Sequence, residues 1–468
     1  MSQKNETTVL LLALGVTLAL VVGGVWFGRI MIQPPKTNNS DSTAPNSSTS
    51  NQPIQERISG GDKLLIPTEA TPEKQAGIKA IASKNYTEAV SKLETAIKRT
   101  PNDPEILIYL NNARIGNQKS YSIAVSVPIT SDVNSAKEIL RGVAQAQNEV
   151  NLAGGIKGIP LKVLIANDDN VPDVAKQVAE AFVKNAEILG VVGHYASDVT
   201  LATVNSYESG QLVVISPTSS SVKLSRASSY VFRTLPSDYV AARALADYML
   251  QKLKEKNVAV FFNSQSGYSQ SLKSEFVTAV ALGGGQVISE FDLSSPNFDP
   301  AQNFNQAIKG GAQVLMLASN TDTLDKALQV IQVNDTKLSL LGGDDVYAPK
   351  TLQIGREAAI NMVVAIPWHI LASPKAEFPK AASQLWGAEV NWRTAMAYDA
   401  AKALIAGIGR NPTRKGVQTA LLASDFSAEG AGGGIRFLPS GDRNQGVQLV
   451  KIVKGSRSSF GYDFVPIP

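Results

Sequence analysis

The pattern of apolar and polar residues divides the chain into four stretches. The first is an uncharged run from Val9 to Phe27, VLLLALGVTLALVVGGVWF, which ends just before Arg29. About 18 such residues can cross a bilayer core as a helix, whereas a secretory signal core has about 7–15 and ends at a small-residue cleavage site. No A-x-A sequence follows this run. We therefore predict a transmembrane signal anchor over residues 1–32, with a cleaved signal peptide as the alternative.

Ser, Thr, Asn and Pro dominate the second stretch, from Pro34 to Pro53, where large apolar residues are absent. A segment of this composition cannot offset the entropy of ordering by burying side chains. We predict a disordered linker over residues 33–68, which would hold a globular part away from the membrane.

The third stretch, residues 69–117, has an amphipathic pattern that predicts helices. Its spacing of small, large and proline residues resembles one tetratricopeptide repeat, although Glu73 stands where the repeat usually has Trp. The residues with this spacing are Gly77, Ala89, Leu93, Ala96 and Pro101. Because a single repeat cannot bury its own apolar face, we expect it to pack on the neighbouring domain, on a second copy or on a partner. A plain helical spacer is the alternative.

In the fourth stretch, residues 118–468, apolar runs of strand length alternate with amphipathic helical segments. Nine strands are predicted, at 121–129, 161–166, 187–193, 212–216, 258–262, 286–292, 312–318, 338–343 and 361–367. This alternation indicates parallel sheets covered by helices on both faces, and nine strands exceed one ordinary sheet. We predict an α/β fold of two doubly wound parallel-sheet lobes. Lobe 1 would comprise about 120–237 and 368–437, and lobe 2 about 238–367 and 438–468.

Polar side chains follow several of the predicted strands, where ligands of such sheets bind. Hydroxyls, amides or helix starts follow four strands, and Asp344 and Asp345 follow a fifth. Hydroxyls and free backbone N–H groups bind a carboxylate, and a carboxylate binds an ammonium group. A serine before a helix is often only a cap, and Pro-Thr-Ser-Ser-Ser can be a plain turn. Their joint placement at successive strand ends favours a site for an α-amino acid zwitterion.

Five segments occur in a familiar order between Tyr121 and Pro468. They are EVNLAGGIKGIPLKVLIANDD, GVVGHYASDVT, VVISPTSSS with the later FRT, SPNFDPAQNFNQAI and GGIRFLPSGDRNQGVQLVKI. In this order they resemble the leucine/isoleucine/valine-binding class of type I periplasmic solute-binding proteins of amino-acid ABC transporters. The resemblance implies the two-lobed type I periplasmic-binding-protein fold, an amino-acid ligand and permease subunits as partners.

The resemblance also implies roles for residues of lobe 1. Ser197 and Ser220 would hold the ligand carboxylate. The Thr218 carbonyl and the Ser220 hydroxyl would take the ammonium group, with Asp344 as its charge partner, and Ser219 belongs to the same turn.

From lobe 2, the resemblance implies that Tyr268 closes over the ligand. Asn320 stands where branched-chain binders often have an aromatic residue, which suggests a ligand with a polar side chain or an amide. Asp344 replaces the commoner Glu and reaches one methylene less. Asp198 brings a negative charge close to the carboxylate site unless its side chain turns away.

Composition sharpens these expectations. A net charge of +4 over 468 residues is nearly neutral, which argues against a nucleic-acid partner. The absence of cysteine excludes disulfides, thiolate zinc sites and a lipid anchor on an N-terminal cysteine, so the run from Val9 would replace that anchor. There are only two histidines, and no phosphate-binding, nucleophile or metal-ligand motif occurs. We predict no enzyme activity, no cofactor and no metal.

The sequence therefore predicts the extracytoplasmic substrate-binding component of an ABC transporter, held at the outer face of a bacterial inner membrane. It would bind an amino acid or a related small polar molecule by closure of its lobes about hinges near Pro236, Pro367 and 437–444. One alternative is an envelope interaction protein that uses the fold as a docking surface, as activators of peptidoglycan synthases do. Another is a ligand-sensing receptor.

Overall fold

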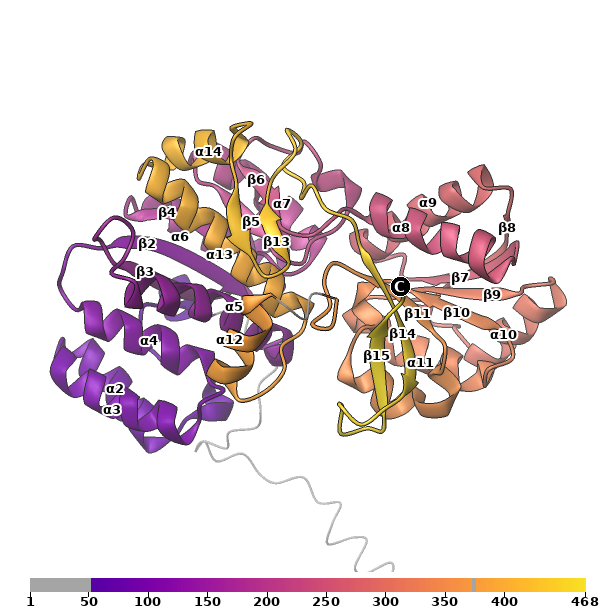
Figure 1. Ribbon diagram of the computed structural model, residues 1–468, viewed down its shortest axis with the longest axis horizontal. Coiled ribbons are helices and arrows are strands. Elements are labelled where there is room, and N and C mark those ends of the chain that lie inside the picture. Colours follow the sequence, from indigo (N-terminus) through magenta and orange to yellow (C-terminus); the bar gives the residue numbers. More distant parts are fainter. Residues whose placement is uncertain (1–51, 373–375) are drawn as a thin grey trace, which may run out of the picture. The chain divides into compact units, whose positions relative to one another are not determined.

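Two sheets, each with helices on both faces, dominate the described part of the chain (Figure 1). The computed structural model describes residues 52–372 and 376–468, which belong to one compact unit. The predicted membrane anchor over 1–32 lies outside these ranges. Among the helices within them, none has the length and apolar character needed to cross a bilayer.

The sheet of lobe 1 has six strands in the order β1-β3-β2-β4-β5-β6, all parallel except β1 at the edge. The strands are β1 (Ile58–Ser59), β2 (Tyr121–Val127), β3 (Leu161–Asn167), β4 (Ile188–Val192), β5 (Val214–Ser216) and β6 (Val231–Arg233). Side chains of β2 alternate between two cores, with Ile123 and Val125 in one and Ala124 in the other. A continuous apolar run is therefore what this doubly covered strand requires.

Helices cover both faces of this sheet. Helices α5 (Val133–Leu152) and α13 (Trp392–Arg410) pack against each other on one face, and α6 (Pro172–Lys184) and α7 (Ser197–Ser209) form a pair on the other. The smaller helices are α12 (Glu377–Trp386) and α14 (Arg414–Leu422). At Gly142 of α5 a Cβ atom would lie 2.3 Å from the Thr394 carbonyl oxygen. Glycine is needed there because the α5 and α13 backbones touch.

The sheet of lobe 2 has seven strands in the order β15-β14-β11-β10-β9-β7-β8. They are β7 (Asn257–Phe262), β8 (Gln286–Asp292), β9 (Val314–Ala318), β10 (Ser339–Gly342), β11 (Val363–Ile366), β14 (Gln448–Lys454) and β15 (Tyr462–Pro466). Its helices are α8 (Asp238–Asp247), α9 (Gly267–Leu282), α10 (Pro300–Lys309) and α11 (Leu324–Asn334). Strands β7 to β11 are parallel to one another. Strand β14 pairs antiparallel with β11 on one side and with the edge strand β15 on the other.

The predicted two-lobed α/β fold is confirmed, and the nine predicted strands are β2 to β5 and β7 to β11. The sheet of lobe 2 also has an antiparallel edge, β14–β15, which is not among the predicted strands. That edge is only partly buried, so its strands lack the long apolar run by which the inner strands were identified.

The chain passes between the lobes three times. The crossings join β6 to α8, β11 to α12, and the hairpin β12 (Ala428–Gly430)–β13 (Gly433–Ile435) to β14. They contain the predicted hinge residues Pro236 and Pro367 and the segment 437–444. The glycine-rich run at Gly430–Gly434 forms the tip of that hairpin, in line with a structural role.

The predicted linker over 33–68 is wrong for its last part. Residues 54–59 form a 3-10 turn and then β1, which pairs with β3 of lobe 1. The buried Arg57 guanidinium donates to Asp169 Oδ2 at 2.7 Å. The preceding Ser/Asn-rich run has no large apolar side chains, whereas this part contains Ile54, Ile58 and the apolar residues 64–66. These side chains pack against the lobe 1 cores, which explains why the segment is folded.

The helical segment consists of α2 (Pro72–Ala82), α3 (Tyr86–Arg99) and α4 (Pro104–Ile115). Helices α2 and α3 form a pair in which a Cβ on Gly77 would lie 2.6 Å from Leu93 Cγ. Helix α4 packs on α5 and β3 of lobe 1. Among the three predicted packing partners of this segment, the structure therefore shows the adjacent domain, lobe 1. The assignment of the segment as a tetratricopeptide repeat stays a prediction.

Candidate functional site

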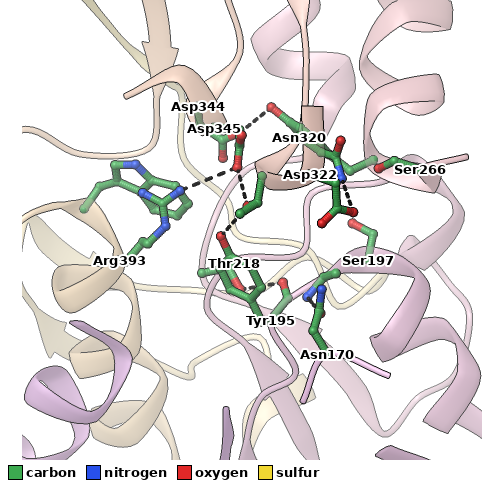
Figure 2. A pocket seen from close by; sticks show the side chains of 14 residues that line it. Asn170, Tyr195, Ser197, Thr218, Ser266, Asn320, Asp322, Asp344, Asp345 and Arg393 are labelled. Carbon is green, nitrogen blue, oxygen red and sulfur yellow. Dashed lines mark hydrogen bonds and ion pairs between the residues drawn. The ribbon is translucent and has the colours of Figure 1, made fainter. Parts of the chain in front are cut away.

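A pocket of about 490 Å³ lies where strand-end loops of the two lobes meet (Figure 2). Lobe 1 contributes the loops after β3, β4 and β5 and the start of α13, and lobe 2 contributes the loops after β7, β9 and β10. Its lining residues are Asn170, Tyr195, Ala196, Ser197, Thr218, Ser266, Tyr268, Asn320, Thr321, Asp322, Asp344, Asp345, Trp392 and Arg393. Five of the seven predicted site residues are in this set.

Ser197 is the first residue of α7, so the helix starts at the pocket. The preceding residue, Ala196, offers no side-chain cap. The first N–H groups of a helix have no intrahelical partner and favour negative charge. The Ser197 Oγ accepts a hydrogen bond from the Ser221 amide at 3.2 Å, which ties the two loops of lobe 1 together. This end of the pocket can bind a carboxylate.

The three polar residues of the turn after β5 lie in different places. Thr218 lines the pocket, and its Oγ1 donates to the Tyr195 carbonyl at 2.7 Å. Ser219 is fully buried away from it, where its hydroxyl pairs with Thr200 at 2.8 Å and holds the loop. Ser220 lines a second, smaller cavity.

The predicted lobe 2 residues gather at the opposite end. Tyr268 at the start of α9 donates its hydroxyl to Asp344 Oδ1 at 2.6 Å. Burial raises the pKa of Asp344, while the Tyr268 hydrogen bond and Arg393 act in the opposite direction. The Asn320 side chain caps the turn after β9, where its Oδ1 accepts from Thr323 Oγ1 at 2.8 Å. Asp344 therefore provides the negative pole of the pocket.

The second cavity, of about 280 Å³, adjoins the first through Tyr268 and Asp344, which line both. Ser220 and Asp238 also line it, next to the hinge residue Pro236. Ser220 Oγ and Asp238 Oδ2 are both buried and have no partner among the described residues. Ser220, Asp238 and Asp344 thus line the same small cavity, and the role of Ser220 toward an ammonium group stays a prediction.

Hydrogen bonds cross from lobe 1 to lobe 2 around the pocket. Asp198 Oδ2 accepts from the Gly267 amide at the start of α9, at 2.7 Å. The Val222 amide donates to Ser271 Oγ at 3.0 Å, and Tyr195 Oη lies 3.1 Å from Thr321 Oγ1. The Asp198 carboxylate is therefore engaged by the opposite lobe rather than by the carboxylate site.

Several pocket residues were not among the predicted site residues. Arg393 and Trp392 open α13, which follows no strand, so a search of strand ends passes over them. Tyr195 and Asp345 adjoin predicted positions but were given no role. Burial raises the pKa of Asp345 to about 7. The nearby Asp344 carboxyl adds to this effect, whereas the Arg393 guanidinium lowers the pKa.

His194 lies behind the carboxylate loop and is fully buried. Its Nδ1 is 2.6 Å from Asp168 Oδ2 and its Nε2 is 2.9 Å from the Tyr207 hydroxyl. Both ring nitrogens are thus occupied, as expected of a structural histidine. In the ranges that the structure describes, no three His, Cys, Asp or Glu side chains are grouped so that they could hold a metal ion.

Comparison with known proteins identifies the family. A leucine-, isoleucine-, valine-, threonine- and alanine-binding protein of Pseudomonas aeruginosa is 24% identical over 255 residues, which cover 54% of this chain and 68% of that protein. A Leu/Ile/Val-binding protein homolog of Brucella melitensis is 25% identical over 293 residues, or 62% of this chain and 78% of that protein.

A crystal structure of a leucine-binding protein from Thermotoga maritima has the same fold, with a TM-score of 0.64 and 22% identity over 74% of this chain and 97% of that one. These relatives are substrate-binding proteins and not enzymes, which confirms the prediction of no enzyme activity. Residues 120–457 match the family described as periplasmic binding protein, and the chain belongs to this family.

Proposed function

We propose that this protein is the extracytoplasmic substrate-binding component of an ABC transporter and that its ligand is an amino acid or a related small polar molecule. One observation carries the proposal. Helix α7 begins at the pocket with Ser197 in lobe 1, where free N–H groups can receive a carboxylate, and lobe 2 brings a carboxyl group, Asp344, into the same pocket. A zwitterion satisfies both ends only when the lobes meet. The names of the relatives, which refer to amino-acid binding, agree with this interpretation.

In the proposed mechanism, the ligand docks on lobe 1 through Ser197, Thr218 and the Ser220 hydroxyl. Tyr268, Asn320 and Asp344 then close over it from lobe 2. A ligand that binds the closed form better than the open form shifts the equilibrium toward closure by that difference in affinity. Because buried charges must be paired, an analogue that lacks the ammonium or the carboxylate group binds poorly.

We further propose that the run from Val9 to Phe27 anchors the protein on the outer face of a bacterial inner membrane and that permease subunits bind the closed form. The support is the uncharged length of this run and the extracytoplasmic place of the family. The helical segment α2–α4 would travel with lobe 1, on which it packs.

The function is tested by calorimetric titration of the full-length chain, unfolded and refolded to remove bound ligand, with a panel of amino acids. We expect at least one amino acid to bind, and no heat from any of them in folded protein would refute the proposal. Asp344→Ala should weaken binding by a factor of about 100 or more, because a buried ammonium group loses its charge partner.

The matched control is Asp173→Ala, which removes a carboxylate on the surface of α6, where its side chain is 84% exposed. This variant should bind like the wild type. An unchanged affinity in Asp344→Ala would remove the ammonium role from Asp344.

A further inference from the structure

One wall of the pocket is not used by the two poles of the proposed ligand. It is formed by Tyr195 and Arg393 from lobe 1 and by Asp345 from lobe 2 (Figure 2). Thr321 of lobe 2 contacts both Tyr195 and Asp345. Arg393 lies in the first turn of α13, and its guanidinium carbon stands 4.4 Å from the ring centroid of Trp392. If Ser197 and Asp344 hold the two poles, this wall remains for the side chain of the proposed ligand.

Arg393 is only 7% exposed, yet no described residue accepts a hydrogen bond from its Nε. Its ion pair with Asp345 spans 3.9 Å from Nη2 to Oδ1, beyond hydrogen-bond distance. Buried guanidinium groups are normally hydrogen-bonded because leaving their donors unpaired costs free energy.

Asp345 has a buried acceptor oxygen without a donor among the described residues, which complements the unpaired donor of Arg393. Its Oδ1 accepts from Thr321 Oγ1 at 3.1 Å, but its Oδ2 is buried without a partner among the described residues. An unsatisfied donor and an unsatisfied acceptor therefore lie next to each other in the same wall. Groups of this kind in a binding pocket are satisfied by a ligand that carries both functions.

Four kinds of side chain can be weighed against this pair. An apolar side chain would leave both groups unpaired. A basic one would place a second cation beside the Arg393 guanidinium, and an acidic one offers only acceptors, so it would leave Asp345 Oδ2 without a donor. A primary carboxamide fits both, because its carbonyl oxygen accepts from Arg393 while its NH₂ group donates to Asp345. The amide is neutral, so the Arg393–Asp345 pair keeps its charge balance.

We infer that the ligand is a neutral amino acid with a side-chain carboxamide, of the asparagine or glutamine type, and that Arg393 and Asp345 determine this specificity. The inference rests on the proposed function, since it assigns the side-chain subsite of the same pocket. It also gives a chemical reason for the polar character of this wall.

The test compares near-isosteric ligands on the refolded full-length chain, with binding measured by calorimetry or by tryptophan fluorescence. We expect glutamine to bind more tightly than methionine, and asparagine more tightly than leucine, by a factor of at least about 100, because the analogue leaves buried polar groups unpaired. Leucine, methionine, glutamate or lysine binding more tightly than both amides would overturn the inference alone. Binding of no amino acid would overturn the proposed function as well.

Two variants separate specificity from structure. Arg393→Met keeps the length of the side chain and removes the donors, and it should reduce the glutamine-to-methionine affinity ratio at least about tenfold. A merely structural role would weaken both ligands equally, and an unchanged ratio would contradict the inference. Asp345→Asn provides the second measurement if Arg393→Met does not fold, and it should reduce the same ratio.

Discussion

At the scale of the residue, Asp238 is a buried carboxyl group next to the site. Its side chain is 1% exposed, its Oδ2 has no partner in the described ranges, and it borders the small cavity beside Ser220. Burial raises the pKa of Asp238 to about 7 from an ordinary value of 3.8, while Ser271 and Ser220 act in the opposite direction. The folded state therefore holds a proton that the unfolded state has already lost over this range.

This difference has a defined sign. Between pH 3.8 and about 7 the folded protein binds more protons at Asp238 than the unfolded chain, so ionisation lowers the free energy of unfolding as the pH rises. Asp238→Asn cannot ionise and should lose less stability over the same window. Thermal unfolding of both proteins across the window checks this, because other buried carboxyls contribute equally to each. A melting-temperature difference that does not change with pH would contradict the raised pKa.

The residue scale also shows what a sequence can predict of a site. Five predicted residues line the pocket because each follows a strand end, where sheet topology gathers side chains: Ser197, Thr218, Tyr268, Asn320 and Asp344. Arg393 was missed because its helix reaches the pocket only after the chain has returned to lobe 1. No local pattern signals that return.

At the scale of the element, the start of α9 acts as a contact point between the lobes. Asp198 of lobe 1 occupies it, and a Cβ on Gly267 would lie 2.1 Å from Asp198 Oδ1. A carboxylate at a helix N-terminus is stabilising by about 0.5–2 kcal/mol. This interaction forms only when the lobes meet, so it favours closure before any ligand contributes.

Asp198→Ala should therefore shift the protein toward open forms and weaken ligand binding about fivefold, the factor that corresponds to about 1 kcal/mol. Because the chain has no cysteine, labels at Leu152→Cys in lobe 1 and Leu282→Cys in lobe 2, which are 74% and 77% exposed, can report the separation of the lobes. Gly267→Ala should act in the same direction. Label distances identical to those of the wild type in both variants would refute this contact as a closing interaction.

The helical segment depends on a buried ionic cluster. Lys74 of α2 is fully buried, with its Nζ 2.6 Å from Asp103 Oδ2 and 2.7 Å from Glu105 Oε2. The Glu105 carboxylate also accepts from the Leu65 amide at 2.7 Å. The cluster thus joins α2, α4 and the segment before them.

Removing one member leaves the others buried and unpaired. Lys74→Met should lower the free energy of unfolding by about 3–5 kcal/mol, whereas Lys79→Met, an exposed change on the same helix, should leave it nearly unchanged. Chemical denaturation of the two variants measures the difference. Equal stability would show that the cluster contributes no net stabilisation.

The prediction of elements succeeded where a physical pattern is local. Strands β2 to β5 and β7 to β11 are apolar runs, which a doubly covered sheet demands. The ordered residues 54–59 were assigned to the linker because a two-residue edge strand has no periodicity of its own. Its structure comes from pairing with β3, more than 100 positions later in the sequence.

At the scale of the whole molecule, α2–α4 and lobe 1 share one apolar core. Ile106 and Leu110 of α4 belong to the same cluster as Ile139 and Val143 of α5. A chain that begins at residue 118 would expose this face to water. We expect such a truncated protein to melt at a lower temperature than the full-length chain or to aggregate, as calorimetry or size-exclusion chromatography would show. Equal melting temperatures would mean that lobe 1 is stable without the helical segment.

The Arg57–Asp169 ion pair and the β1–β3 pairing also have a mechanical meaning. They bind residues 57–59 to the sheet of lobe 1, directly after the predicted linker. A pulling force applied to the N-terminal segment would therefore act on lobe 1 first. If a membrane holds residues 9–27, lobe 1 stays close to the anchor, and lobe 2 is the lobe that moves when the protein opens and closes.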